Sequence, residues 1–424
     1  MDKNSKTIIS ACYITNIICS ATSCVSPLLF LTLKTMYNIS YSLLGLLIVI
    51  GFLTQLFIDL IFTFFSKKFN INLCVILMPI LSVVGLIMYG LTPWILPHHE
   101  YIGLVISTFF ISISSGLVEV LLSPLVAALP SSNPDKEVSK LHSVFAWGVV
   151  GIVIVFSLFM RIFGYDHWQY FIFIIAIFPI LSIILFSISK LPNIYFDEKQ
   201  FKIKTLLKNK WVWLGCIAIF VGGATENIMS QWASTFLELS VGIPKVYGDI
   251  FGVAMFSLML GLGRTLYSKY GKHLSKIMII GSFGATICYI IAGISMIPIL
   301  GLICCGLTGF CVSMLWPGNL IECNHKVKNG GVVLFAFMAA GGDLGASVGP
   351  QLIGIITDAV AKHSNIIHTA SQYGLNAEQV GMKLAILICT IFPIISTIIS
   401  IINNRYYRKK ILINDKNSRV VKKK

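Results

Sequence analysis

Residues 222–238 read GGATENIMSQWASTFLE, and this stretch sets an acidic side chain, Glu226, within a segment that is otherwise suited to a lipid bilayer. The residues before it, WVWLGCIAIFV, are apolar, and so are the residues GDIFGVAMFSLMLGLG that follow a short loop. An ionised side chain at the bilayer centre costs roughly 2.5–3.5 kcal/mol on insertion scales. We therefore expect Glu226 to face protein or an aqueous cavity rather than lipid.

The composition of the whole chain is that of an integral membrane protein. Its 424 residues are 56% hydrophobic and 12% charged, whereas soluble domains use about 25% charged residues. The 11 cysteines include one adjacent pair and no C-x-x-C or Cys/His cluster. This pattern predicts no metal site, no cofactor and no disulfide framework. The first apolar run, from about Ile8 to Leu33, is too long for a signal-peptide core and predicts an uncleaved span.

Apolar runs of about 20 residues predict twelve membrane spans. They lie near residues 8–33, 42–65, 71–92, 101–128, 141–163, 168–189, 211–237, 246–268, 277–296, 298–320, 331–357 and 382–403. The boundary between the ninth and tenth spans is the weakest, because Pro298 is nearly its only break.

The spans group into two sets of six, which gives the expected domains. These are an amino-terminal six-helix bundle at 1–190, a polar and basic linker at 191–210, a carboxy-terminal bundle at 211–410 and a basic tail at 411–424.

The basic residues predict the orientation of these spans. With twelve spans, 27 of the 32 lysines and arginines fall on the side of both chain ends. The positive-inside rule therefore predicts that both termini are cytoplasmic. The net charge of +15 is therefore explained mainly by the orientation of the spans in the membrane. Contact of basic residues with anionic lipid headgroups is a secondary explanation, and nucleic-acid binding is not needed.

An internal repeat also supports two halves. The second predicted span ends in DLIFTFFSKKF and the eighth in RTLYSKYGKHL. When the two are aligned, Ser66-Lys67 falls on Gly271-Lys272 and Asp59 falls on Arg264. Weak symmetry at the spacing of two six-helix halves is typical of transporters built from repeats.

These basic turns resemble degenerate copies of the loop signature G-x-x-x-D-R-x-G-R-K of the major facilitator superfamily. Thr63 and Ser268 stand where that signature has its acid, and Ser66 replaces its glycine in the first copy. The segments FLTQLFIDL, GLVEVLLSPLVAALP, LHSVFAWG, GGATENIMSQWASTFLE, MLWPGN and GGDLGASVGP resemble a bacterial branch near the fucose permease-like sugar and proton symporters.

The resemblance implies an all-α membrane protein of two pseudo-symmetric six-helix bundles around a central cavity. It also implies a multi-pass protein of the bacterial-type inner (plasma) membrane that acts as a monomer. The drug-exporter signature G-x-x-x-G-P-x-x-G-G is absent from the fifth span. A partial copy, Gly345-x-x-x-Gly349-Pro350, occurs instead in the eleventh.

Three acids fall well inside predicted spans and are the candidates for proton coupling: Glu119, Glu226 and Asp343. A carboxyl group that loses hydration holds a proton more readily, which a proton-coupled carrier requires. The alternative role for each is a structural hydrogen bond between helices. Asp343 lies among closely spaced glycines, so a gating or coupling role and an interhelical bond are equally open for it.

The surroundings of Glu119 and Glu226 favour a cavity. On the fourth span, polar and small residues recur at intervals of three and four: Ser112, Ser115, Gly116, Glu119 and Ser123. On the seventh, Gly222, Glu226, Ser230 and Ala233 share one face, and Asn227, Gln231 and Ser234 lie beside it. Small residues and serines also mark helix interfaces, so packing is the alternative explanation.

The resemblance implies that the first, fourth, seventh and tenth helices line the cavity. The candidates for solute contact are Asn16, Ser123, Asn227, Ser230, Gln231, Trp232, Trp316 and Asn319. Amides donate to and accept from sugar hydroxyls, and tryptophan rings stack on the apolar faces of sugars. Packing or interfacial anchoring is the alternative for the tryptophans.

Charged residues near predicted span ends are candidates for gates: Asp59, Lys67, Lys68, His142, Arg264 and Lys269. Asp59 is alternatively an interfacial acid near Lys67 and Lys68. Histidine as a residue type changes charge near neutral pH, which makes His142 a candidate sensor of cytoplasmic acidity, but a lone histidine at a helix end is more often a cap or a headgroup contact.

Together these features predict a secondary transporter, and most simply the proton-coupled uptake of a small polar solute such as a sugar. Its partners would be that solute, protons and the bilayer. Export of drugs or metabolites is the alternative, and a non-transporting membrane sensor is a third. An enzyme is the weakest hypothesis, because the sequence holds no nucleophile motif, phosphate loop or metal-ligand cluster.

Overall fold

The computed structural model describes residues 2–421 except 66–67, 131–133, 193–207, 271–272, 328–330, 364–367, 369–370 and 373. The described residues form helices and no strands. The predicted linker, 191–210, lies almost wholly outside the described residues, and so does Lys67.

The helices of the first half are α1 (Lys3–Tyr37), α2 (Tyr41–Phe65), α3 (Ile71–Ile95), α4 (Glu100–Ala127), α5 (Pro134–Phe163), η2 (Tyr165–His167) and α6 (Trp168–Ser187). Those of the second half are α8 (Lys210–Val241), α9 (Lys245–Gly248), η3 (Asp249–Ala254), α10 (Met255–Tyr270), α11 (Leu274–Ile294), α12 (Pro298–Val312), α13 (Leu315–Lys326), α14 (Gly331–Ala361), α16 (Ala377–Cys389) and α17 (Ile391–Val421).

Twelve described segments are long and apolar enough to cross a membrane, which confirms the predicted number. The weakest predicted boundary, between the ninth and tenth spans, is confirmed: α11 ends at Ile294, and α12 begins at Pro298. Proline suits the first turn of a helix, because that turn has no intrahelical acceptor for its N–H.

The predicted end of the tenth span, at residue 320, was too early. The span consists of α12 and α13 and runs from Pro298 to Lys326. Its last turns, in the stretch NLIECNHK, carry too many polar residues for a hydropathy window to include them. Glu322 consequently lies within the helical segment that forms this span.

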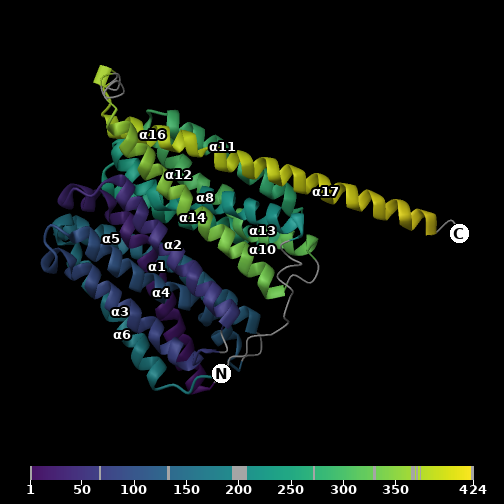
Figure 1. Cartoon of the computed structure of the whole chain (residues 1–424), viewed down its shortest axis with the longest axis horizontal. Coiled ribbons are helices and arrows are strands. Elements are labelled where there is room, and N and C mark those ends of the chain that lie inside the picture. Colours follow the sequence, from purple (N-terminus) through teal and green to yellow (C-terminus); the bar gives the residue numbers. More distant parts are fainter. Residues whose placement is uncertain are drawn as a thin grey trace.

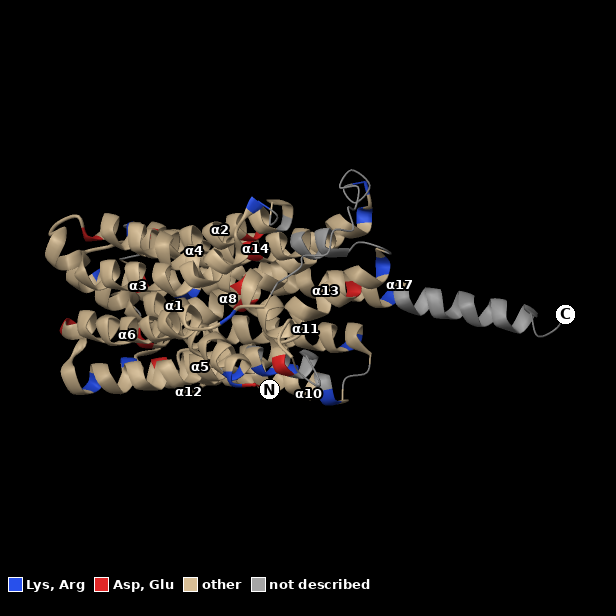
Figure 2. Cartoon of the chain, turned by 90° about the horizontal axis from the view of Figure 1, so that it is seen from below, with Lys and Arg blue, Asp and Glu red and all other residues tan. Residues whose placement is uncertain are grey.

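The two halves of the chain lie side by side as two groups of helices (Figure 1). The purple-to-blue helices of the first half contact the teal-to-yellow helices of the second half along three main pairs: α2 with α14, α1 with α8, and α5 with η3 and α10. Most of the helical ribbon in Figure 2 carries no charge, although acidic segments occur among the helices near α8 and α14.

Glycines allow α14 to pack closely on α8 within the second half. A side chain at Gly345 would overlap the backbone carbonyl of Phe220, and one at Gly349 would press on Ala224. The glycine-rich stretch around Asp343 therefore has a packing role, because small residues let membrane helices approach closely.

Because the number of spans is even, both chain ends leave the bundle on the same side. We call this the terminal side, and we call the other the far side. Helices α2, α4 and α10 end on the terminal side, and α1, α5, α8 and α14 end on the far side.

Candidate transport site and far-side gate

Glu119 is exposed, although the five residues before it on α4, Ser114 to Val118, are all buried. It interacts electrostatically with Asp59 of α2 and with Asp343 of α14. Cys19 of α1 also lies within range of its charge. An exposed side chain near α1, α2 and α14 faces the space between the two halves rather than lipid.

These three acids share one level of the bundle, nearer the terminal side. Glu119 lies eight residues before the end of α4 and Asp59 six before the end of α2, which is about 12 Å and 9 Å of helix. Asp343 is 5% exposed, and the buried Oδ1 atom of Asp59 has no hydrogen-bond partner among the described residues. The structure thus brings Asp59, predicted as a gate residue, together with two of the predicted coupling acids.

Glu226 has a different partner. Its Oε1 atom lies 3.2 Å from Nη2 of Arg264 on α10. The Nε atom of Arg264 donates to the Ser313 carbonyl at 3.1 Å, at the junction of α12 and α13. The Arg264 side chain is 43% exposed and that of Glu226 is 15% exposed, so the pair borders an accessible space. The sequence predicted Glu226 as a coupling residue and Arg264 as a gate residue, but it did not predict that the two form an ion pair.

One face of α8 around Glu226 is half-buried, whereas most neighbouring positions are buried. Glu226, Asn227, Ser230 and Gln231 are the half-buried residues. Asn227 donates to the Gly223 carbonyl at 3.0 Å, and Ser230 to the Asn227 carbonyl at 3.3 Å. Their side-chain oxygens therefore remain available as acceptors on this face.

The same pattern occurs on α4. Glu119, Val120, Ser123 and Pro124 are exposed or half-buried, and Leu121 and Leu122 between them are buried. Both helices carry the spacing G-x-x-E-x-x-x-S, from Gly116 to Ser123 and from Gly223 to Ser230. The repeated spacing is a sequence signal that marks the two acids as one kind of position.

Four predicted solute contacts instead contact other parts of the protein. Asn16 donates to the Leu141 carbonyl at 2.7 Å. Asn319 donates to the carbonyls of Ala218 and Leu315 at 3.0 and 2.7 Å. Trp232 is 1% exposed and donates to the Pro350 carbonyl at 2.9 Å. Trp316 packs over Gly342 and Gly223.

Two of the remaining gate candidates, Lys68 and Lys269, lie near the ends of α2 and α10. Lys68 lies over the Phe65 ring, and Lys269 lies over the Tyr270 ring, both at 5.1 Å near the terminal side. Lys67 and the His142 side chain lie outside the described part of the structure.

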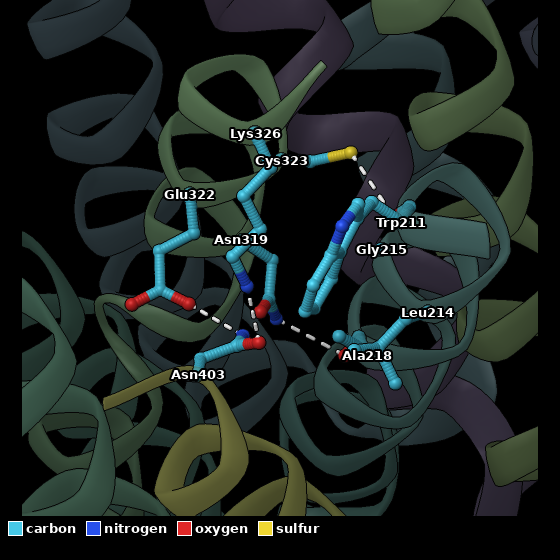
Figure 3. A pocket seen from close by; sticks show the side chains of 9 residues that line it. All are labelled: Trp211, Leu214, Gly215, Ala218, Asn319, Glu322, Cys323, Lys326 and Asn403. Atoms are coloured by element: carbon cyan, nitrogen blue, oxygen red, sulfur yellow. Dashed lines mark hydrogen bonds between the residues drawn. The ribbon is translucent and has the colours of Figure 1, made fainter. Parts of the chain in front are cut away.

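Sequence reasoning did not identify a buried polar cluster in the second half that is built around Glu322 (Figure 3). Glu322 is 2% exposed and accepts hydrogen bonds from Ser275 of α11 and Asn403 of α17. Lys326 donates to Asn403 and lies 4.6 Å from the centre of the Trp211 ring. The cluster joins four helices, and the pocket beside it has a volume of about 10 Å³, room for about one water.

On the far side, Asp358 at the end of α14 caps the first turn of α2 in the other half. Its carboxylate accepts from the backbone N–H groups of Tyr41 and Ser42 at 3.2 and 2.7 Å, and from the Ser42 hydroxyl at 2.6 Å. Glu378 of α16 completes this contact, because it binds Lys34 at 2.9 Å and accepts from the Tyr41 hydroxyl.

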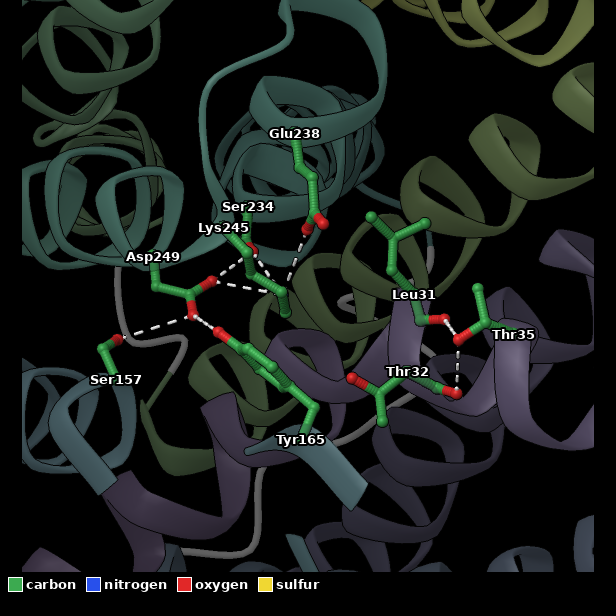
Figure 4. Close-up of polar contacts among 9 residues, drawn as sticks. All are labelled: Leu31, Thr32, Thr35, Ser157, Tyr165, Ser234, Glu238, Lys245 and Asp249. Atoms are coloured by element: carbon green, nitrogen blue, oxygen red, sulfur yellow. Dashed lines mark hydrogen bonds and ion pairs between the residues drawn. The ribbon is translucent and has the colours of Figure 1, made fainter. Parts of the chain in front are cut away.

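A second set of far-side contacts surrounds Asp249 (Figure 4). Asp249 is fully buried, lies 3.3 Å from Lys245 and accepts from Ser234. Ser157 of α5 and Tyr165 of η2 reach it from the first half at 3.5 Å. Both Lys245–Asp249 and Glu322–Lys326 have the i, i+4 spacing of a helical ion pair, which is the sequence signal that could have revealed them.

The contacts between the two halves and the accessible carboxyl groups lie in different parts of the bundle. The two sets of contacts hold the halves together on the far side. Nearer the terminal side, carboxyl groups from both halves lie beside an accessible space. The described residues include no group of three or more His, Cys, Asp or Glu side chains that could hold a metal ion.

A comparison with protein families matches residues 11–350 to the model of the Major Facilitator Superfamily. None of the curated protein sequences gives a significant match.

Similar solved structures have low sequence identity but cover nearly the whole chain. A bacterial homologue of the human lysosomal transporter Spinster has a TM-score of 0.74 at 13% identity, over 96% of this chain and 98% of that one. A D-xylose–proton symporter has 0.72 at 14%, over 92% and 97%. The E. coli fucose:proton symporter has 0.60 at 13%, over 95% and 99%.

Proposed function

The chain belongs to the major facilitator superfamily, and from this premise we propose that it is a secondary active transporter that works by alternating access. The proposed reaction is the proton-coupled uptake of a small polar solute, such as a sugar or a sugar derivative. The family and the fold point to a transporter rather than an enzyme, and the twelve spans make it a multi-pass membrane protein.

The observation that supports coupling most directly is the position of Glu119. It is exposed between the halves and lies within range of Asp59 and of Asp343, which belongs to the other half. Like charges in a low-dielectric space repel one another strongly, so protonation of Glu119 changes the force between α4 and α14. A proton bound there therefore favours one arrangement of the halves over the other.

The Glu226–Arg264 pair supports a second role, in solute binding. Arg264 presents donors beside the half-buried face of α8 that carries Asn227, Ser230 and Gln231. Hydroxyl groups of a sugar both donate and accept, which this mixture of amide, hydroxyl and guanidinium groups matches. These residues, rather than Asn16, Asn319 or Trp232, are the solute contacts that we now propose.

The far-side contacts supply the closed gate of this cycle. With the far side held by Asp358 and Asp249, we propose that the space beside Glu119 opens toward the terminal side. If the termini are cytoplasmic, as the basic residues predict, this is the state open to the cytoplasm. Release of the far-side contacts would then give the opposite state.

Ligand-dependent stability tests this function first. We expect a sugar, polyol, nucleoside or amino acid to raise the thermal unfolding midpoint of the purified protein, because a ligand stabilises the state that it binds. The stabilising solute should then accumulate in proteoliposomes that have an imposed proton gradient, and an uncoupler should collapse that accumulation.

Other outcomes separate the alternatives. Efflux from loaded vesicles without uptake, together with stabilisation by apolar solutes, would replace uptake by export of drugs or metabolites. No stabilisation by any of these solute classes and no flux in either direction would favour a membrane sensor that does not transport.

A further inference from the structure

A groove with a volume of about 740 Å³ lies on the outside of the first half, between α1, α5 and α6. None of the residues that line it belongs to the second half, so it is separate from the space beside Glu119. Its walls include Ile17, Val155, Ile174 and Phe178, which are 40%, 55%, 45% and 51% exposed. In a membrane-spanning bundle, such a surface is in contact with lipid.

Polar side chains occur at one end of this groove only. Tyr13, Lys140 and Ser143 lie on the terminal side, and the other lining residues are apolar or glycine, with Trp147 as the one amphipathic ring. Lys140 comes three residues before the apolar span that starts at Ser143. The polar end is therefore at the membrane surface, where tryptophan and lysine commonly meet lipid headgroups.

The groove is long enough to hold one acyl chain of a lipid. Lys140 and Val155 are fifteen residues apart on α5, which corresponds to about 22 Å of helix. One leaflet contributes about half of a hydrocarbon core of about 30 Å. A chain that starts at the surface can thus lie in the groove over the full depth of its leaflet.

Lys140 provides charge for a headgroup. Its side chain is 50% exposed and binds Glu137 at 2.9 Å. The hydrogen bond that Lys140 donates to the Glu137 carboxylate raises the pKa of the Lys140 ammonium, so the group stays cationic. An ammonium has three donors, and the exposed half of this side chain leaves donors free for a phosphate oxygen beside the carboxylate.

The open space in the groove arises at Gly151. A side chain added there would meet no atom within 4 Å. Gly148, one turn before Gly151 on α5, instead packs against Ser20 of α1, so α1 and α5 are in direct contact beside this open space.

We propose that this groove binds an anionic phospholipid of the terminal-side leaflet, with one acyl chain along α5 and the phosphate group at Lys140. The acyl chain is already in an apolar environment in the bilayer or the detergent micelle, so its van der Waals packing against the groove walls, rather than removal of apolar surface from water, favours binding. The charge at Lys140 selects the headgroup. The bound lipid would fill the space between α5 and α6 and stabilise the first half.

Thermal unfolding of the purified chain in neutral detergent tests this site. The probes are phosphatidylglycerol, phosphatidylcholine with the same acyl chains, and inorganic phosphate. Gly151→Leu fills the groove from α5, and Ile174→Trp fills it from α6. Gly261→Leu is the matched control, because Gly261 on α10 also has open space around it. Lys140→Gln removes the headgroup partner, and Lys269→Gln is its control.

We expect phosphatidylglycerol to raise the unfolding midpoint of the wild type, Gly261→Leu and Lys269→Gln by more than phosphatidylcholine does. This excess shift should be lost in Gly151→Leu and in Ile174→Trp, and at least halved in Lys140→Gln. Equal shifts for both lipids, an undiminished shift in both groove-filling variants, or the same shift with inorganic phosphate would each overturn the proposal. If one of the two groove-filling variants fails to fold, the lipid-dependent shift of the other variant tests the proposal.

Discussion

Arg264 makes two contacts that serve different purposes. Its Nη2 atom binds Glu226, and its Nε atom donates to the Ser313 carbonyl at the junction of α12 and α13. The second contact fixes the guanidinium, so that it stays at the edge of the accessible space even when Glu226 releases it. A lysine could not do both, because it has no planar fork of donors.

We predict that Arg264→Lys retains the fold but lowers the proton-driven accumulation of solute at least tenfold, whereas the unfolding midpoint changes little. A half-exposed ion pair contributes about 1 kcal/mol or less to stability, so its loss should be visible in transport rather than in unfolding. Uptake into proteoliposomes, measured beside the unfolding midpoint of the same preparation, checks this. Normal accumulation in Arg264→Lys would remove Arg264 from the solute site.

At this scale the sequence indicates candidate residues by their type, but it does not show which way their side chains point. Glu119, Glu226 and Asp343 could be found because an acid within an apolar run is costly and therefore informative. Asn16, Asn319 and Trp232 looked equally suited to solute binding. Their donors are taken by carbonyls of Leu141, Ala218, Leu315 and Pro350, and only the packed structure supplies those partners.

At the scale of elements, the Glu322 cluster holds α11, α13 and α17 together. We predict that Glu322→Ala lowers the thermal unfolding midpoint, because Ser275 and Asn403 lose their shared acceptor and Lys326 loses a nearby opposite charge. Each buried donor left unpaired costs about 1–3 kcal/mol. Glu322→Gln should recover part of that loss, because its amide oxygen still accepts. Equal midpoints for wild type and Glu322→Ala would contradict a structural role for the cluster.

Hydropathy was sufficient for the number and order of the spans, because each needs about 20 apolar residues. It failed where a span ends in a polar cluster, as α13 does at Lys326. The paired charges of Lys245–Asp249 and Glu322–Lys326 neutralise each other locally, which makes an acid tolerable inside a span. A count of single acids could not reveal them.

At the scale of the whole molecule, the proposed far-side gate determines which state is populated. We predict that Asp358→Asn moves the population toward a state that is open on the far side. The change replaces a charged acceptor by a neutral amide that has only one oxygen for the three donors of α2. Hydrogen bonds to charged groups contribute about 1.5–3 kcal/mol, against about 0.5–1.5 kcal/mol for neutral ones. Because 1.4 kcal/mol is a factor of ten in an equilibrium constant, the shift is large enough to detect.

Spin labels at His99 and Lys362, one on the far side of each half, report this opening by their separation in a cysteine-free background. The label distances should lengthen in Asp358→Asn and stay unchanged in Asp166→Asn, which alters an exposed acid on the same side. Identical distance distributions for Asp358→Asn and the wild type would contradict the gate.

Two-fold architecture was visible in the repeated basic turns and in the division into six and six spans. The contacts on the far side could not be predicted from the sequence, because some of them join residues more than 300 positions apart, such as Asp358 and Ser42. Such pairs leave no local pattern in one sequence. The lipid groove was equally invisible, since it arises from a gap between helices rather than from any motif.

The central claim is that protonation of Glu119 couples solute movement to the proton gradient. Proteoliposomes containing Glu119→Gln test it most directly, with the solute found by thermal shift and with wild type as reference. The account predicts that the variant exchanges labelled for unlabelled solute at near wild-type rates but does not accumulate solute when a proton gradient is imposed. Accumulation to the wild-type level in Glu119→Gln would contradict the account.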